Sequence, residues 1–152
     1  TNFNTLNGLI HINKKVIMDG FDTIVSVDWL KANINHDQLI VLDASIPKVG
    51  SQSLKPNQKY IPKARFFDIK NAFSDVNATF PNTIPSEIQF ETEAQKLGIN
   101  NTSFIVVYDA LGIYSSPRAW WLFKTFGHNN VAVLDGGLPE WEASGYVTEH
   151  KF

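Results

Sequence analysis

The chain has 152 residues with 13 basic and 15 acidic side chains, and its net charge of −2 argues against a basic surface for nucleic acid or anionic membranes. Hydrophobic residues make up 43% of the sequence, which suits one globular domain, and no apolar run approaches the roughly 20 residues that span a bilayer. There is no cysteine, which excludes disulfides, thiolate metal sites and thiol catalysis, and we expect a cytoplasmic location.

The first 23 residues are rich in asparagine and show little hydrophobic periodicity. The run VIMDG at residues 16–20 is compatible with a short strand, but no longer element is indicated. We therefore expect residues 1–23 to be a poorly ordered N-terminal extension.

From residue 23 onward, apolar runs alternate with helical patterns. Residues 23–34 predict a brief strand and then a helix, with Ser26 as N-cap and Asp28 in the first turn. Four further runs predict strands, at residues 39–44, 64–69, 104–109 and 131–137. Runs that are apolar on both faces are typical of buried parallel strands. The pattern therefore predicts an α/β fold with a doubly wound sheet of about five strands.

Three further helices carry their own start and stop signals. In PSEIQFETEAQKLGI, Ser86 and Gln89 have the spacing of a capping box and Gly98 ends the helix. In SPRAWWLFKTFG, Ser116 is the predicted N-cap, Pro117 the first helical residue and Gly127 the stop. LPEWEASG predicts a shorter helix that ends at Gly145, and the long loop at residues 45–59 lies outside the alternation.

Three predicted strands end in aspartate, at Asp43, Asp109 and Asp135. Ligands of open α/β sheets bind beyond the carboxyl ends of the strands, so all three point to a functional edge. The simpler alternative is that aspartate is favoured in turns for its local hydrogen bonds, and the sequence leaves both readings open.

Other catalytic patterns are weak. An aspartyl-phosphate enzyme would need a second acidic residue near Asp109, but Leu111 stands two positions on. Ser115 and Ser116 lack a G-x-S-x-G elbow, and the glycine pair in LDGGLPEW lacks the dinucleotide spacing. The four histidines are scattered without metal-ligand spacing, so we expect no metal site; they are His11, His36, His128 and His150.

Arg118 lies one turn inside a predicted helix N-terminus, which is a favourable place for an anion. Asp109 could supply that anion from within the chain. The alternative is that Arg118 is a surface or salt-bridging residue.

Taken in order, seven motifs resemble the N-terminal domain of the tandem rhodanese proteins, the thiosulfate and 3-mercaptopyruvate sulfurtransferases. They are VSVDWL, LIVLDAS, KYIPKARFFDI, FPNTIPS, LGI, VVYDALGIYSSPRAWWLFKTFGH and VAVLDGGLPEWEASG, and the resemblance covers residues 25 to about 147. The resemblance implies a rhodanese-like fold over residues 24–148, a five-stranded parallel sheet with helices on both faces. Residues 149–152 would then begin an interdomain linker.

The resemblance also implies a division of labour between two domains. The C-terminal domain of such proteins carries a cysteine, cradled by backbone N–H groups, that becomes a persulfide. The N-terminal domain lacks it and walls the cleft. On this reading the chain has no catalytic residue, cofactor or metal, and its partner is the C-terminal rhodanese domain of the same parent protein. The non-catalytic loop comprises Asp109, Ala110, Leu111, Gly112, Ile113, Tyr114, Ser115 and Arg118.

The sequence departs from the family pattern at three positions. The usual His-Ile-Pro-Gly-Ala reads Tyr60-Ile61-Pro62-Lys63-Ala64, so Tyr60 replaces the family histidine and Lys63 the family glycine. A second usual histidine is Asn82. Roles assigned to the family histidine therefore do not transfer to this chain.

Three hypotheses for the function of the chain remain. The first is the non-catalytic half of a sulfurtransferase, which should expose an apolar patch at Leu111, Ile113 and Tyr114. The second is a stand-alone, inactive rhodanese-like interaction module. The third is an enzyme that uses Asp109 with a metal, for which no second carboxylate is suitably spaced.

Overall fold

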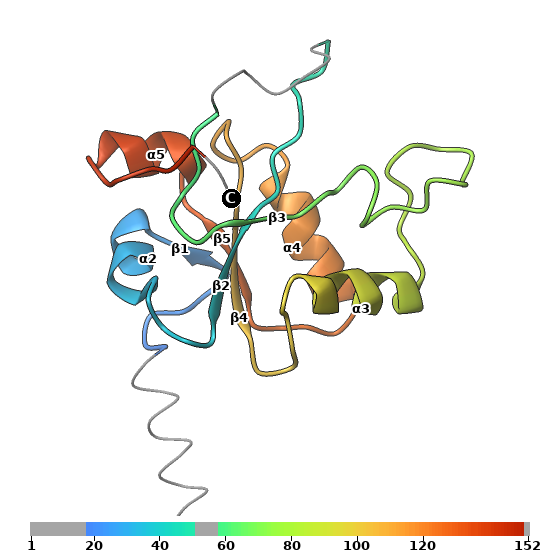
Figure 1. Cartoon of the computed structure of the whole chain (residues 1–152), viewed down its shortest axis with the longest axis horizontal. Coiled ribbons are helices and arrows are strands. Elements are labelled where there is room, and N and C mark those ends of the chain that lie inside the picture. The colour runs from blue at the N-terminus through green and yellow to red at the C-terminus, as the bar shows by residue number, and fades with distance from the viewer. Residues whose placement is uncertain (1–17, 51–57, 151–152) are drawn as a thin grey trace, which may run out of the picture.

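Five parallel strands form one sheet in the computed structural model, which describes residues 18–50 and 58–150. The strand order is β1-β5-β4-β2-β3, and Figure 1 shows α2 and α5 on one side of the sheet and α3 and α4 on the other. The elements are β1 Ile24–Val25, α2 Val27–Asn33, β2 Leu39–Asp43, β3 Arg65–Phe66, α3 Glu87–Lys96, β4 Phe104–Tyr108, α4 Ser116–Thr125, β5 Val131–Leu134 and α5 Gly137–Ala143. The predicted five-stranded parallel α/β fold is confirmed.

The three central strands, β2, β4 and β5, are buried on both faces because helices cover each face of the sheet. In β2, Leu39 and Val41 belong to the core under α2 and α5, whereas Ile40 and Leu42 belong to the core under α3 and α4. This alternation follows the two-residue period of a strand. None of the helices in the described ranges has the length and hydrophobicity needed to cross a bilayer.

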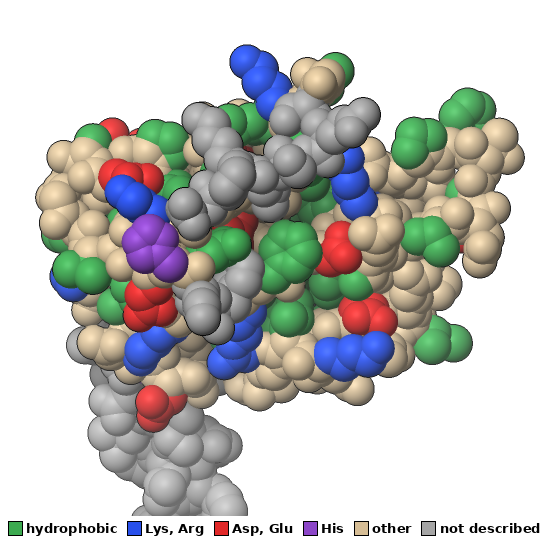
Figure 2. Space-filling view, turned by 45° about the horizontal axis from the view of Figure 1, so that its top comes forward, with side chains coloured by type: hydrophobic (Ala, Val, Ile, Leu, Met, Phe, Trp, Pro, Cys, Tyr) green, Lys and Arg blue, Asp and Glu red, His purple; other side chains and the backbone are tan. Residues whose placement is uncertain are grey.

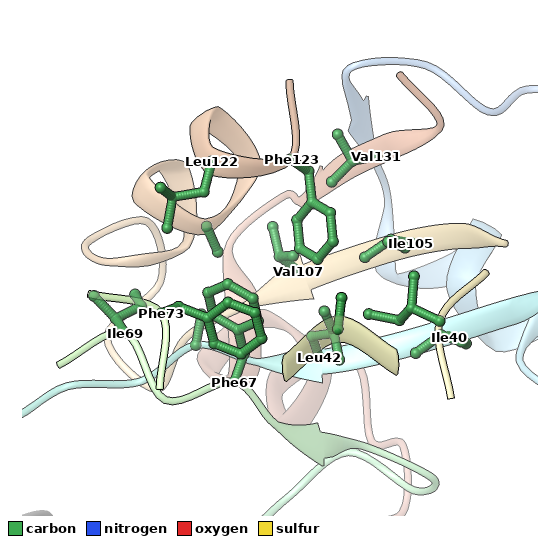
Figure 3. Close-up of a cluster of buried hydrophobic side chains, with 14 of the residues drawn as sticks. Ile40, Leu42, Phe67, Ile69, Phe73, Ile105, Val107, Leu122, Phe123 and Val131 are labelled. Atoms are coloured by element: carbon green, nitrogen blue, oxygen red, sulfur yellow. The ribbon is translucent and has the colours of Figure 1, made fainter. Parts of the chain in front are cut away.

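The core under α3 and α4 combines four buried phenylalanines with aliphatic side chains (Figure 3). Phe67 and Phe73 stack with ring centroids 3.8 Å apart. Phe123 of α4 lies 5.5 Å from Phe67 and 5.1 Å from Phe90 of α3. Aromatic packing therefore fixes α4, whose N-terminus faces the carboxyl edge of the sheet.

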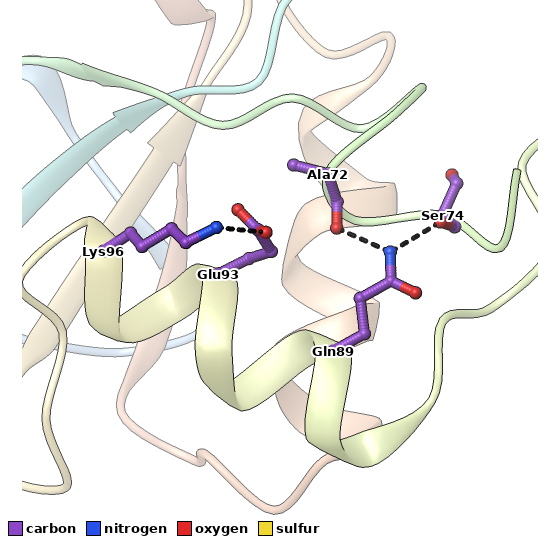
Figure 4. A network of polar contacts seen from close by, with 5 residues as sticks. All are labelled: Ala72, Ser74, Gln89, Glu93 and Lys96. Atoms are coloured by element: carbon purple, nitrogen blue, oxygen red, sulfur yellow. Dashed lines mark hydrogen bonds and ion pairs between the residues drawn. The ribbon is translucent and has the colours of Figure 1, made fainter.

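The predicted helix caps are confirmed for α2 and α3, with one difference. The hydroxyl of Ser26 accepts the Trp29 N–H at 3.0 Å, and that of Ser86 accepts the Gln89 N–H at 3.1 Å. The Gln89 side chain does not complete a capping box. Its Nε2 donates instead to the carbonyls of Ala72 and Ser74, at 2.9 and 2.8 Å (Figure 4).

The predicted strand at residues 64–69 is wrong in length, because only Arg65–Phe66 pair with β2. Its partner β2 ends at Asp43, so the backbone beyond Phe66 has no continuing ladder.

The segment of residues 18–23 belongs to the predicted extension, yet it packs on the domain. Met18 is buried, and the Phe21 ring lies 5.6 Å from that of Trp29 and 5.1 Å from that of Phe104. Of the possible strand at 16–20, residues 18–20 form a turn, and the rest lies outside the described residues.

Lys63 occupies the left-handed backbone region, with φ at 66°. This conformation costs a residue with a Cβ about 1 kcal/mol, whereas glycine adopts it freely. We expect Lys63→Gly to raise the free energy of unfolding by about 0.5–1 kcal/mol in urea titrations. Lys63→Ala keeps the Cβ and should give no such gain; equal gains from both variants would contradict a backbone origin.

Candidate functional site

Two of the three strand-end aspartates lie together at the carboxyl edge of the sheet. Asp43 ends β2 and Asp109 follows β4, and each is only 1% exposed. Asp135 after β5 is exposed, so the structure does not bring it into the same buried cluster.

The carboxylate of Asp109 is held by four backbone N–H groups of the loop that follows it. Its Oδ1 accepts the N–H of Leu111 at 2.9 Å. Its Oδ2 accepts the N–H groups of Tyr114, Ser115 and Ser116 at 2.8, 3.0 and 2.9 Å. Asp109 is therefore an internal anion in a cradle of amides at the N-terminus of α4.

The charged state of Asp109 is favoured. Burial by itself raises the pKa of this carboxyl, but backbone hydrogen bonds from Tyr114, Ser116 and Leu111 outweigh it, so the pKa lies below its ordinary value of 3.8. An ionised carboxylate whose lone pairs accept hydrogen bonds from four donors is a poor nucleophile. Few of its lone pairs remain free to coordinate a metal.

The predicted N-cap Ser116 is wrong by one residue. Ser115 is the N-cap of α4, and its hydroxyl makes no capping bond but donates to the Ala44 carbonyl at 2.6 Å. The Asp109 carboxylate takes over the capping, because it accepts the N–H groups of both serines from outside the helix.

The paired glycines after β5 support this loop from the other side. Gly137 has φ at 56°, and a Cβ there would stand 2.4 Å from the Gly112 carbonyl oxygen and 2.6 Å from that of Asp109. The start of α5 can therefore approach the loop, and the Leu138 N–H donates to the Asp109 carbonyl at 3.1 Å. The sequence analysis excluded a dinucleotide site here but missed this packing role.

A second buried network surrounds Asp43. Its Oδ1 accepts the Ser45 N–H at 2.8 Å and also the Ser45 hydroxyl, while its Oδ2 accepts the Tyr108 hydroxyl at 3.3 Å. The Tyr108 oxygen in turn accepts the Ile61 N–H at 3.2 Å, and the Ser45 oxygen accepts the Ala110 N–H at 2.9 Å. The network ties the ends of β2 and β4 to the loop that starts at Asp109.

The Asp43 network shifts the pKa values of its members upward. Burial raises the pKa of the Asp43 carboxyl against the lowering effect of its hydrogen bonds from Ser45 and Tyr108. Burial, with the nearby Asp43 charge, raises the pKa of the Tyr108 hydroxyl far above its ordinary value. Ser45 and Tyr108 were not singled out from the sequence, although an aspartate followed two residues later by serine is a turn signal.

Arg118 does not contact the carboxylate of Asp109. Its Nη2 donates to the Asn82 carbonyl at 2.6 Å, and its guanidinium lies 4.9 Å from the Trp121 ring centroid. Among the described residues, the ion pairs are Lys59–Glu142 and Lys96–Glu93, so Arg118 is not salt-bridged there. Its role here is to join α4 to the segment before α3.

The tip of the Asp109 loop is apolar and open to solvent. Leu111 is 48% exposed, Ile113 52% and Tyr114 40%, and the Tyr114 hydroxyl accepts the Val49 N–H at 3.3 Å. Figure 2 turns the carboxyl edge toward the viewer and shows hydrophobic side chains near the centre of this face with charged ones around them. We name Leu111, Ile113 and Tyr114 the edge patch.

Tyr60, which stands where the resemblance places a histidine, pairs with Glu149 near the end of the described residues. It exchanges two backbone hydrogen bonds with Glu149, at 2.6 and 2.8 Å. His128 is half-buried, with its Nε2 2.8 Å from the Ser103 carbonyl oxygen. Within residues 18–50 and 58–150, no three histidine, aspartate or glutamate side chains are grouped as a metal site.

Comparison with known proteins gives a consistent family signal. The family described as "Rhodanese-like domain" matches residues 26–144. Thiosulfate/3-mercaptopyruvate sulfurtransferase 1, mitochondrial, from Arabidopsis thaliana is 46% identical over 132 residues, which are 84% of this chain and 34% of that protein. The 3-mercaptopyruvate sulfurtransferase of Escherichia coli K12 is 35% identical over 129 residues, 82% of this chain and 46% of that protein.

Solved structures agree with the sequence matches. The crystal structure of SseA from Escherichia coli superposes with a TM-score of 0.78 at 32% identity, covering 85% of this chain and 50% of SseA. The Tum1 protein of Saccharomyces cerevisiae gives a TM-score of 0.73 at 25% identity, covering 86% and 45%. The chain thus spans half or less of these proteins' length.

Proposed function

The chain belongs to the rhodanese-like family, and we propose that it is the non-catalytic N-terminal half of a thiosulfate/3-mercaptopyruvate sulfurtransferase. The sulfane sulfur would be carried as a persulfide by a cysteine on a C-terminal rhodanese domain. This chain would line one side of the active-site cleft around that cysteine. Its similarity to the N-terminal part of tandem sulfurtransferases supports the assignment.

The observation that carries the proposal is the occupied cradle. Persulfide transfer needs a nucleophilic thiolate, and backbone N–H groups stabilise the negative charge on sulfur. In this chain the amide cradle is present, but the Asp109 carboxylate accepts all four of its N–H groups. A carboxylate cannot carry a sulfane sulfur in place of a thiolate, and the chain has no cysteine to do so.

The edge patch supports a partner at this face. Its three exposed apolar side chains lie on one loop at the carboxyl edge of the sheet, and such a surface favours contact with another protein. The curated relatives extend well beyond the matched part, which gives room for a second domain. We also propose a cytoplasmic location for this protein. The Arabidopsis thaliana relative named above is described as mitochondrial.

The proposal is tested by docking the separately produced cysteine-bearing domain of the parent protein to this chain in a calorimetric titration. We expect a complex, and we expect Leu111→Ser or Ile113→Ser to weaken it about tenfold or more, because each removes an apolar contact. Ile24→Ser is the matched control, since Ile24 is 54% exposed on β1, at the sheet edge opposite to β3. Equal affinities for all variants would show that the face is wrongly placed.

The second candidate is a stand-alone interaction module, which the same edge patch would serve. The two differ in the parent coding sequence. The first proposal requires the reading frame to continue into a cysteine-bearing domain of similar length, and the second requires it to stop near residue 152.

A further inference from the structure

The segment between β3 and α3 carries a second exposed apolar surface, apart from the edge patch. Residues 74–85, which we name the arm, reach away from the domain beside α4 (Figure 1). Phe80 is 75% exposed, Val76 64% and Ile84 38%. A large aromatic ring this exposed at a loop tip contributes little to the core. Its burial against a partner would be energetically favourable.

The arm is held in shape by its own hydrogen bonds. The Asp75 N–H donates to the Thr83 carbonyl at 2.9 Å, which closes the arm on itself, and the Thr83 hydroxyl donates to the Phe80 carbonyl at 2.7 Å. At its base, Gln89 of α3 holds the carbonyls of Ala72 and Ser74. A surface that is already ordered loses less conformational entropy on binding than a flexible loop.

The composition of the arm suits a buried contact. Asp75 is the only charged residue among residues 74–85, and its carboxylate already accepts the Asn77 N–H at 3.0 Å. Charged residues are depleted at the centres of protein interfaces, whereas aromatic residues are enriched. A hollow of about 380 Å³ lies beside the arm, lined among others by Lys70, Val76 and Phe80, and it has room for a side chain from a partner.

Arg118 joins the arm to the start of α4, which directly follows the loop of residues 109–115, named here the edge loop. This side chain stands in the first turn of α4, directly after the amides that hold Asp109, and its Nη2 donates to the Asn82 carbonyl of the arm. Asn82 has φ at 57°, in the left-handed region that asparagine adopts more readily than most residues with a Cβ. The contact therefore fixes the arm beside the N-terminus of α4, on the side of the sheet edge where the edge patch lies.

From this placement we propose that the arm is a second docking element for the same rhodanese domain that covers the edge patch, with Phe80 as its anchor. The inference rests on the proposed function. One domain of similar size can contact both surfaces, because Arg118 holds the arm beside the start of α4, which directly follows the edge loop. The matched residues cover less than half of the curated relatives, so proteins of this kind have the length for such a domain.

The test is a titration of the isotopically labelled chain with the separately produced second domain. We expect amide shift changes at Ala78, Phe80 and Thr83 in the same titration that moves Leu111 and Tyr114. Phe80→Ser should raise the dissociation constant about tenfold or more, as expected for an aromatic anchor. Ile24→Ser should leave the constant unchanged, and the unfolding midpoint of Phe80→Ser should match the parent chain because the ring is exposed.

The outcomes separate the two proposals. Shifts confined to the edge loop, with unchanged affinity for Phe80→Ser, would overturn the role of the arm and leave the proposed function in place. The absence of any complex at high protein concentration would overturn both. Shifts on both surfaces with weakened binding by Phe80→Ser would support both.

Discussion

Replacing Asp109 with asparagine should lower the free energy of unfolding by about 3 kcal/mol or more. Oδ2 accepts three backbone N–H groups and Oδ1 accepts one, and the residue is 1% exposed. In asparagine one of these positions becomes an NH₂ group that faces a backbone donor. At least one N–H of the cradle then loses its acceptor, and the remaining ones lose a charged partner. Urea titration of both proteins at neutral pH measures the loss.

The same pair of proteins should show a specific pH dependence. The pKa of Asp109 is lowered in the folded state, so its stabilising effect is complete above the ordinary pKa of 3.8 and is lost as the pH falls through the folded value. The difference in unfolding free energy between the two proteins should stay constant above about pH 5 and shrink at lower pH. It reports mainly Asp109, because Asp43 is present in both.

Asp135→Asn is the matched control, since Asp135 also follows a strand at the carboxyl edge but is exposed. We expect it to change the free energy of unfolding by less than about 0.5 kcal/mol. If Asp109→Asn were no more costly than Asp135→Asn, the amide cradle would not depend on the carboxylate.

Phe123→Ala should cost about 3–5 kcal/mol, because the ring is fully buried between Phe67 and Phe90. The cavity would loosen α4, and amide exchange at Ser115 and Ser116 should speed up with it, since α4 begins at these residues. Thr125→Ala, on the exposed end of the same helix, is the control and should be nearly neutral. A loss below about 1 kcal/mol would show that the aromatic core does not hold this helix.

The sheet could be predicted because its signals are local. Runs such as residues 39–44 and 104–109 are short, rich in β-branched residues and apolar on both faces, as strands covered on both sides are. The length of β3 could not be predicted in the same way. Phe67 and Ile69 alternate with Asp68 as residues of a strand would, but pairing stops where β2 stops, and that depends on a partner distant in sequence.

In the candidate site, too, contacts between residues close in sequence could be predicted, whereas contacts between distant segments could not. Asp109 and the amides it binds lie within seven residues of one another, so an internal anion could be suspected from the sequence. The Asp43–Tyr108 contact joins residues 65 positions apart, and it exists because β2 pairs with β4 in that register. Ser116 was predicted as the N-cap because serine is favoured there, but Ser115 is the N-cap residue and the Asp109 carboxylate accepts the N–H groups of both serines.

The most direct measurement of the central claim is thiocyanate formation from thiosulfate and cyanide by the purified chain, alone and after addition of the cysteine-bearing second domain. The carboxylate-filled cradle predicts no turnover above the buffer rate for the chain alone, and turnover when the second domain is present. Clear turnover by the cysteine-free chain alone would contradict the assignment of Asp109 as a non-catalytic anion in the place of a thiolate.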